Sequence, residues 1–184
     1  MERCGVERVF RHSFCKEPTV PDRIDTERYL YDLIRDFRTA MLVSRSSSGE
    51  FHARPMAVAD LRADADAFFV TSVNSVKVME IEHDPRVVVT FQSDKIFATI
   101  NGTATIIQDK TLVEKLWSPT WKIWFPGGAT DPSLCLLRVD AVEAEYWDNS
   151  GLQGLKFVFA GLQSALHGTP RIADKTQHAK VEFD

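Results

Sequence analysis

Short stretches of alternating apolar residues fill the middle of the chain and predict β-strands. These stretches cover residues 40–43, 53–59, 67–72, 86–91 and 95–107. The polar segment 60–66 separates the second from the third and predicts the turn of a hairpin. A helix is expected at 75–83, and it should end at Asp84-Pro85 because a proline disfavours helical backbone in the residue before it.

Four more elements flank this region. We expect a helix at 25–37, a helix at 111–117, a strand at 134–147 and an amphipathic helix at 152–166. Asp25 can cap the first helix, and Thr111-x-x-Glu114 has the spacing of a capping box for the second. Gly168 and Pro170 would close the last helix.

The dipeptide Asn101-Gly102 is a common hairpin signal, but a turn at 92–95 already precedes it. We therefore expect one long strand with a bend at Gly102. Closely spaced strands with small helices favour a mainly β, α+β fold, an antiparallel barrel with flanking helices. Residues 1–24 are expected to form an arm, and residues 25–184 a single domain.

Composition and charge narrow the possible partners. The chain has 184 residues, 44% of them hydrophobic, and a net charge of -4, so a general basic face for nucleic acid is not expected. It has no apolar run of membrane-spanning length and no secretory signal. Three cysteines without metal-binding spacing favour a reduced, cytoplasmic compartment.

Two cations bracket a candidate phosphate site. The predicted hairpin would place Arg54 beside Thr71-Ser72, and Ser75 would cap the helix that carries Lys77. Hydroxyls, free amides at a helix start and two cations together suit a phosphate. The alternative is an ordinary surface strand–turn–helix with solvated charges, and composition alone does not separate the two.

A phosphate site at the rim of a barrel indicates a phosphorylated ring compound, and flavin mononucleotide (FMN) fits this description. The aromatic cluster Trp117, Trp121, Trp124 and Phe125 could border a planar ring or could simply pack a core or a subunit contact. The sequence has no GxGxxG, GxxxxGK[ST], HExxH or GxSxG motif, and its five histidines are dispersed, so no metal site is expected.

Several segments resemble one known family. RPM at 54–56, FFVTSVNSVKVMEI at 68–81 and HDPRVVVTF at 83–91 resemble the FMN-binding split-barrel proteins related to pyridoxamine 5′-phosphate oxidase. The run from Leu116 to Pro132, together with AEYWD at 144–148, is similar to the general stress protein 26 branch. The closing segment at 180–183 resembles the last strand of that branch.

The resemblance implies a six-stranded antiparallel split barrel and a homodimer, with FMN in each of two clefts between the subunits. FAD is the alternative flavin. Arg54 and Lys77 match the phosphate-binding cations, and Trp147 matches a position that reaches the flavin from the partner chain. The implied cofactor contacts are Arg54, Met56, Thr71, Ser72, Ser75, Lys77 and Trp147.

Departures from the family pattern bear on activity. Ala59 occupies the place where true pyridoxamine phosphate oxidases carry a lysine for the substrate phosphate, and 149–154 lacks their arginine/histidine motif. We therefore expect a flavin-dependent redox protein of unknown substrate. A flavin-binding stress or sensor protein without turnover remains the alternative. A haem-binding relative is disfavoured, because no histidine occupies a recognisable axial position.

Overall fold

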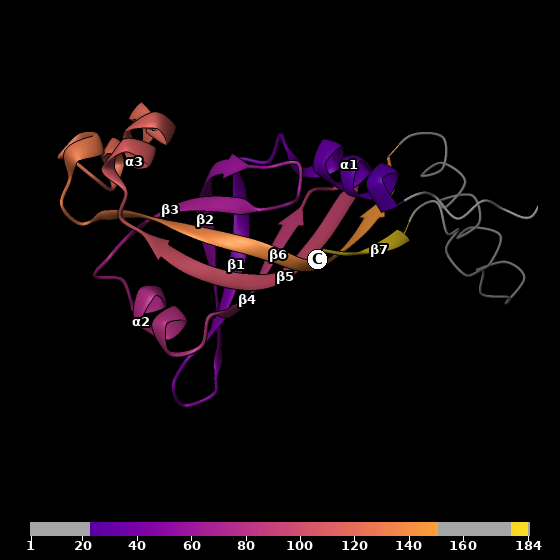
Figure 1. Cartoon of the computed structure of the whole chain (residues 1–184), viewed down its shortest axis with the longest axis horizontal. Helices are drawn as coiled ribbons and strands as arrows, with labels where there is room; N and C mark the ends of the chain where they lie inside the picture. Colours follow the sequence, from indigo (N-terminus) through magenta and orange to yellow (C-terminus); the bar gives the residue numbers. More distant parts are fainter. Residues whose placement is uncertain (1–22, 151–177, 184) are drawn as a thin grey trace, which may run out of the picture.

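Six antiparallel strands close into a barrel with helices at both ends (Figure 1). The computed structural model describes residues 23–150 and 178–183. The strand order is β3-β2-β1-β4-β5-β6, and pairing of β3 with β6 closes the ring. The described strands are β1 (Thr39–Arg45), β2 (Phe51–Leu61), β3 (Ala67–Ser72), β4 (Arg86–Gln92), β5 (Ile96–Ile107), β6 (Leu134–Asp148) and β7 (His178–Glu182), which extends the sheet along β6. The predicted six-stranded antiparallel barrel is confirmed.

Alternate residues of the strands fill the barrel. In β1 and β4 every second side chain is buried, as expected for strands with one face on a core. Phe91 of β4 meets Phe37 edge to face, with ring centroids 5.6 Å apart. Helix α1 (Arg23–Ile34) closes this end of the barrel through Leu30 and Ile34, both fully buried.

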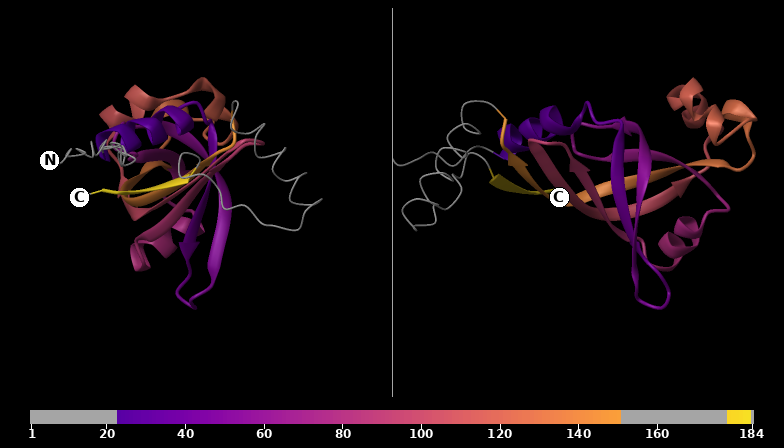
Figure 2. Two further views of the ribbon diagram at one scale, coloured as in Figure 1. Left: turned by 90° about the vertical axis from the view of Figure 1, so that its right-hand side faces the viewer. Right: turned by 180° about the vertical axis from the view of Figure 1, so that it is seen from behind.

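A smaller core lies at the opposite end of the barrel, where α3 (Lys110–Leu116) and two 3-10 turns connect β5 to β6 (Figure 2). The turns are η1 (Pro119–Ile123) and η2 (Gly128–Thr130). Trp121 and Phe125 pack here against apolar residues of the barrel wall. This packing confirms a structural role for part of the aromatic cluster.

Close approach of two strands requires the glycine in β5. The strand runs without a break, and its register with β6 shifts between Asn101 and Gly102. A Cβ at Gly102 would lie 2.4 Å from the carbonyl oxygen of Asp140 and 2.9 Å from Val139. The single long strand predicted here is therefore confirmed, and the alternative hairpin is wrong.

Two predicted helix details differ from the structure. Helix α1 begins at Arg23 and ends at Ile34, because Phe37 turns into the core instead of continuing the helix. Helix α3 is capped by Asp109, whose carboxylate accepts from the backbone N–H groups of Thr111 and Leu112 at 2.8 and 3.2 Å. The capping box assigned to Thr111 is wrong, because a charged cap lies two residues earlier.

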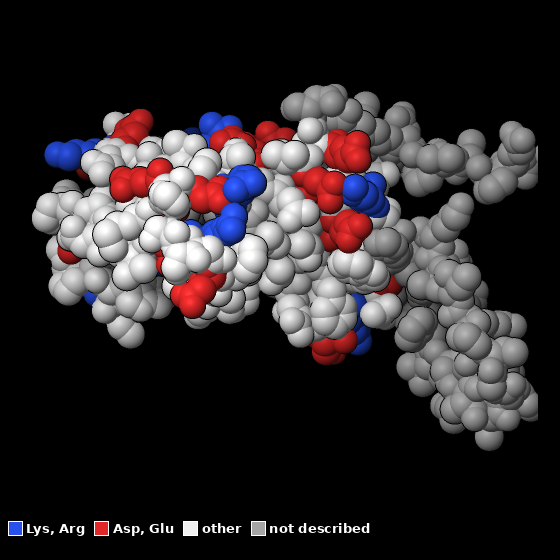
Figure 3. Space-filling model, turned by 90° about the horizontal axis from the view of Figure 1, so that it is seen from below, with Lys and Arg blue, Asp and Glu red and all other residues white. Residues whose placement is uncertain are grey.

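Residues 1–22, which make up most of the predicted arm, and the predicted helix at 152–166 lie outside the described residues. Among the described helices, none is long and apolar enough to span a bilayer. Acidic and basic side chains are interspersed over the face in Figure 3, and among its described residues they form no continuous basic surface. This mixture is consistent with the net charge of -4.

Candidate functional site

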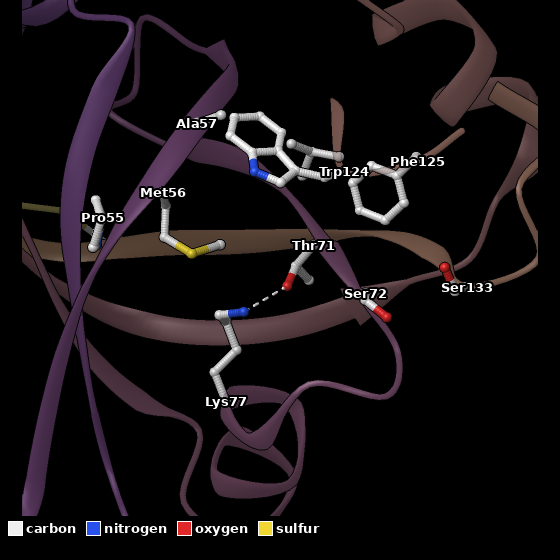
Figure 4. Close-up of a pocket in the computed structure, with 10 residues that line it drawn as sticks. Pro55, Met56, Ala57, Thr71, Ser72, Lys77, Trp124, Phe125 and Ser133 are labelled. Carbon is white, nitrogen blue, oxygen red and sulfur yellow. Dashed lines mark hydrogen bonds between the residues drawn. The ribbon is translucent and has the colours of Figure 1, made fainter. Parts of the chain in front are cut away.

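A pocket of about 410 Å³ opens between β2, the end of β3, the start of helix α2 (Val76–His83) and the 3-10 segment (Figure 4). It is lined by Pro55, Met56, Ala57, Val70, Thr71, Ser72, Lys77, Trp124, Phe125 and Ser133. Four of the predicted cofactor residues, Met56, Thr71, Ser72 and Lys77, therefore meet in one place.

The polar end of the pocket is built where β3 passes into α2. The chain turns after Ser72, whose carbonyl accepts from the N–H of Ser75 at 3.1 Å. Helix α2 then directs the Lys77 ammonium back over the strand end, where Nζ donates to the Thr71 hydroxyl at 3.0 Å. The hydroxyl oxygens of Thr71 and Ser75 lie 3.4 Å apart. Two hydroxyls and one cation thus lie together beside the first turn of a helix, where backbone N–H groups lack helical partners.

Ser75 occupies the N-cap position of α2 with extended backbone angles, as predicted, but its side chain makes no capping hydrogen bond. Its hydroxyl instead faces Thr71. The predicted side-chain cap is therefore wrong, because the Ser75 hydroxyl points to the Thr71 hydroxyl and not to the backbone N–H groups of the helix. This leaves the Ser75 hydroxyl close to the polar end of the pocket.

Lys77 is a partly buried cation, and its hydrogen-bond partner, the hydroxyl of Thr71, is neutral. Burial lowers its pKa, and the nearby charge of Arg54 lowers it further, against weaker opposing effects of Cys135 and Glu80. Within the described residues Lys77 forms no ion pair. An ammonium in this situation would be stabilised by an anion in the pocket, since an anion restores the charged form.

Arg54 lies next to Pro55 on β2 and does not line the pocket. Its guanidinium donates to the hydroxyl of Ser44 and, at 2.8 Å, to the carboxylate of Glu80 on α2. The structure therefore holds Arg54 by an internal ion pair to α2, the helix that also carries Lys77.

Glu80 is the centre of this ion-pair cluster and is only 5% exposed. Its carboxylate accepts hydrogen bonds from Ser44 at 2.5 Å and from Arg54, and it meets His52 Nδ1 at 2.5 Å. Burial raises the pKa of Glu80, but the three hydrogen bonds outweigh burial and hold the pKa at about 2. The carboxylate is therefore ionised throughout the neutral range.

The aromatic residues divide between two roles. Trp121 is buried and stacks edge-on against Trp117, with centroids 5.7 Å apart. Trp124 is 62% exposed, and its indole lies across the pocket from Lys77 (Figure 4). A large exposed aromatic beside a cavity is unusual in a core-packing residue and suits contact with a planar ligand.

Trp147 lies far from this pocket within one chain. It pairs with Phe97 and His178 near the end of β6, whereas Leu134 at the start of β6 pairs with Ser72 at the pocket. The strand has 15 residues, so its two ends are separated by up to about 46 Å at about 3.3 Å per residue. Trp147 of the same chain is not brought to the pocket.

Four residues of this region were missed by sequence reasoning: Glu80, His52, Ser44 and Ser133. One sequence signal pointed to Glu80, because Lys77 and Glu80 are three residues apart on one helix and must share a face.

The thiol of Cys135 is fully buried, and burial raises its pKa to about 11. Among the described residues, no group of histidine, cysteine, aspartate and glutamate could hold a metal ion.

The chain is similar to proteins of a fungus and of several bacteria. Protein bli-3 of Neurospora crassa is 30% identical over 149 residues, which cover 71% of each chain. The general stress FMN/FAD binding protein of Xanthomonas citri is 31% identical, with a TM-score of 0.59 over 69% of this chain and 91% of that one. A general stress protein 26 from Bacillus anthracis is 24% identical, with a TM-score of 0.60 over 66% and 92% of the two chains, and shares the fold.

The family described as "Pyridoxamine 5'-phosphate oxidase like" matches residues 25–171. This match spans the whole barrel and the pocket between β2, β3 and α2. Together with the closed six-stranded barrel, it confirms the family resemblance seen in the sequence. The chain therefore belongs to the pyridoxamine 5′-phosphate oxidase-like family.

Proposed function

We propose that this protein binds a flavin in the Lys77 pocket, with FMN preferred over FAD, and that it acts in redox chemistry on a substrate not yet known. The observation that carries the proposal is the pocket itself, which combines an exposed indole with a cation that has no anionic partner among residues 23–150 and 178–183. A relative at 31% identity is named as an FMN/FAD binding protein, which supports a flavin.

The residues fit the two ends of FMN. Lys77, with the hydroxyls of Thr71 and Ser75, would hold the phosphate, and Arg54 would add a second cation. Met56 and Trp124 would border the isoalloxazine, for which a flat, largely apolar slot is needed. When bound, the flavin supplies the redox chemistry, and these side chains supply binding and orientation.

Absorption spectroscopy and titration test this proposal. Purified protein is expected to carry or take up FMN, with a visible flavin spectrum and an affinity at least tenfold above that for riboflavin, because riboflavin lacks the phosphate. FAD should bind more weakly than FMN. Protein that takes up neither FMN nor FAD at micromolar concentration would refute the proposal.

A second function, flavin binding without dedicated turnover, is favoured by one observation. Among the ten residues that line the pocket, Lys77 is the only titratable side chain. A redox enzyme often needs a positioned proton donor or acceptor beside the flavin. Reduction by NADH or NADPH separates the two functions, because an enzyme should show saturable turnover with an acceptor and a sensor should be reduced slowly and without saturation.

We further propose that the protein is a cytoplasmic homodimer. A groove of about 490 Å³ is lined mainly by residues of β1, β4 and β5, together with Phe51 of β2 and Val142 of β6, which are 74% and 52% exposed. Exposed apolar surface of this kind is typical of protein contacts. The family resemblance implies that a second copy brings its Trp147 to the pocket of the first. Sedimentation at low micromolar concentration should show a dimer, and a monomer that still binds FMN tightly would count against this arrangement.

A further inference from the structure

Glu80 makes none of the flavin contacts proposed above. It is a buried carboxylate on α2, the helix whose Lys77 lines the pocket. It lies on the same face of α2 as Lys77, about one turn further along. Opposite this face of the helix, His52 and Arg54 project from the same side of β2, because alternate residues of a strand share a side. Arg54 is thus ion-paired to Glu80, one turn along α2 from Lys77.

We propose that Glu80 is a positioning residue for the anion site: it fixes the guanidinium of Arg54 beside Lys77, so that Arg54 can act as the second phosphate-binding cation. The inference rests on the proposed binding of a flavin phosphate. It assigns to Glu80 a role in selecting phosphorylated over unphosphorylated flavin, which acts through Arg54 and involves no contact between Glu80 and the ligand.

The hydrogen-bond geometry supports this role. A guanidinium has five N–H donors, and Ser44 and Glu80 are the hydrogen-bond partners of Arg54 in the described part of the chain. Nη1 of Arg54 donates one N–H to Ser44 and Nη2 donates one N–H to Glu80. The remaining N–H groups of the guanidinium are available for an anion. Because Arg54 is held by two buried partners, its rotamer freedom is lost when the protein folds and need not be lost when the ligand binds.

Charge alone predicts the opposite effect of Glu80. Its carboxylate is negative and ionised, so it offsets one of the two cations and should weaken the attraction of a phosphate. Removing that charge would then tighten FMN binding. Removing the anchor of Arg54 would weaken FMN binding, because the guanidinium would have to be ordered by the ligand itself. The sign of the change therefore distinguishes a positioning residue from a mere counter-charge.

Glu80→Gln is the appropriate variant, since the amide keeps the size of the side chain and removes its charge. We expect FMN affinity to fall about tenfold, with riboflavin affinity unchanged within about twofold, because the charge-assisted hydrogen bond that fixes Arg54 becomes a weaker neutral one and only the phosphate end depends on it. Glu82→Gln is the matched control, because Glu82 is exposed on the same helix and should leave both affinities unchanged.

A double-mutant cycle shows whether Glu80 acts through Arg54. In an Arg54→Ala background, Glu80→Gln should have little further effect on FMN affinity, because the side chain that it positions is gone. Equal effects in both backgrounds, or tighter FMN binding by Glu80→Gln, would overturn the inference. If Glu80→Gln does not fold, Ser44→Ala takes its place, since Ser44 also anchors Arg54 and should lower FMN affinity in the same selective way.

The side-chain NMR signals of Arg54 provide a readout that does not depend on flavin. In the wild-type protein the terminal N–H groups should exchange slowly with water, and in Glu80→Gln they should exchange rapidly. Rapid exchange in both proteins would overturn the positioning role whatever the ligand is. If the exchange changes as expected but wild-type protein binds no flavin, the proposed function fails while the anchoring of Arg54 stands.

Discussion

Neutralising Glu80 should change how the stability of the protein depends on pH. The carboxylate is buried, and its hydrogen bonds from Ser44, His52 and Arg54 exist only in the folded chain. The perturbation is Glu80→Gln, which keeps the shape of the side chain. The quantity of interest is the free energy of unfolding of the wild type minus that of the variant, because other acidic groups contribute equally to both proteins and cancel.

The magnitude follows from the pKa of Glu80, which lies at about 2 in the folded protein against an ordinary value of 4.5. A shift of this size corresponds to about 3 kcal/mol at about 1.36 kcal/mol per pKa unit. Solvent at the His52 end of the cluster screens part of the interaction, which leaves about 2 kcal/mol. Because the folded pKa is depressed, this stabilisation is complete above pH 4.5 and is lost as the pH falls toward 2.

Urea denaturation at pH 7, 5, 4 and 3 measures this difference. We expect wild type to exceed the variant by about 2 kcal/mol at pH 7 and pH 5, and the difference to shrink by pH 3. A difference that is the same at pH 5 and pH 3 would refute the reasoning, because it would mean that folding does not change the pKa of this carboxyl.

Three further predictions concern the site and the barrel. Lys77→Met and Arg54→Ala should each weaken FMN binding by about 1.5–3 kcal/mol and leave riboflavin binding little changed, as measured by fluorescence titration. Gly102→Ala should lower the free energy of unfolding by about 3 kcal/mol in urea denaturation, because its Cβ would meet the carbonyl oxygen of Asp140 at 2.4 Å. Protein loaded with FMN should not oxidise pyridoxamine 5′-phosphate, because Ala59 offers no cation to the substrate phosphate; saturable formation of pyridoxal phosphate would contradict this.

The barrel could be predicted from the sequence because its determinants are local. The alternation of apolar residues predicted the strands, and β5 runs through Gly102 as one strand, as expected. The cap of α3 could not be chosen in this way. Asp109 and Thr111 are both good capping residues two positions apart, so the sequence pattern alone does not decide between them. The carboxylate caps the helix, and it accepts two N–H groups at once.

The candidate site could be predicted only in part, because its residues depend on contacts between distant segments. The Lys77–Thr71 contact spans a short turn and follows from the strand–turn–helix pattern. The partners of Arg54 do not, since Ser44 lies on another strand and Glu80 lies on α2. Only the barrel brings these three segments together, so the sequence left open a phosphate-binding or a solvated cation and did not reveal the ion pair that the structure shows.

The position of Trp147 connects the family pattern with the geometry of one chain. The family resemblance places this residue against the flavin, whereas β6 separates it from Lys77 by most of the length of a 15-residue strand. Its segment is also held in place, because the Asp148 carboxylate accepts a hydrogen bond from Tyr29 of α1. A hinge within one chain would have to break this contact and the pairing of β6 with β5. A second copy needs neither change, so a ligand that contacts both Lys77 and Trp147 requires two chains.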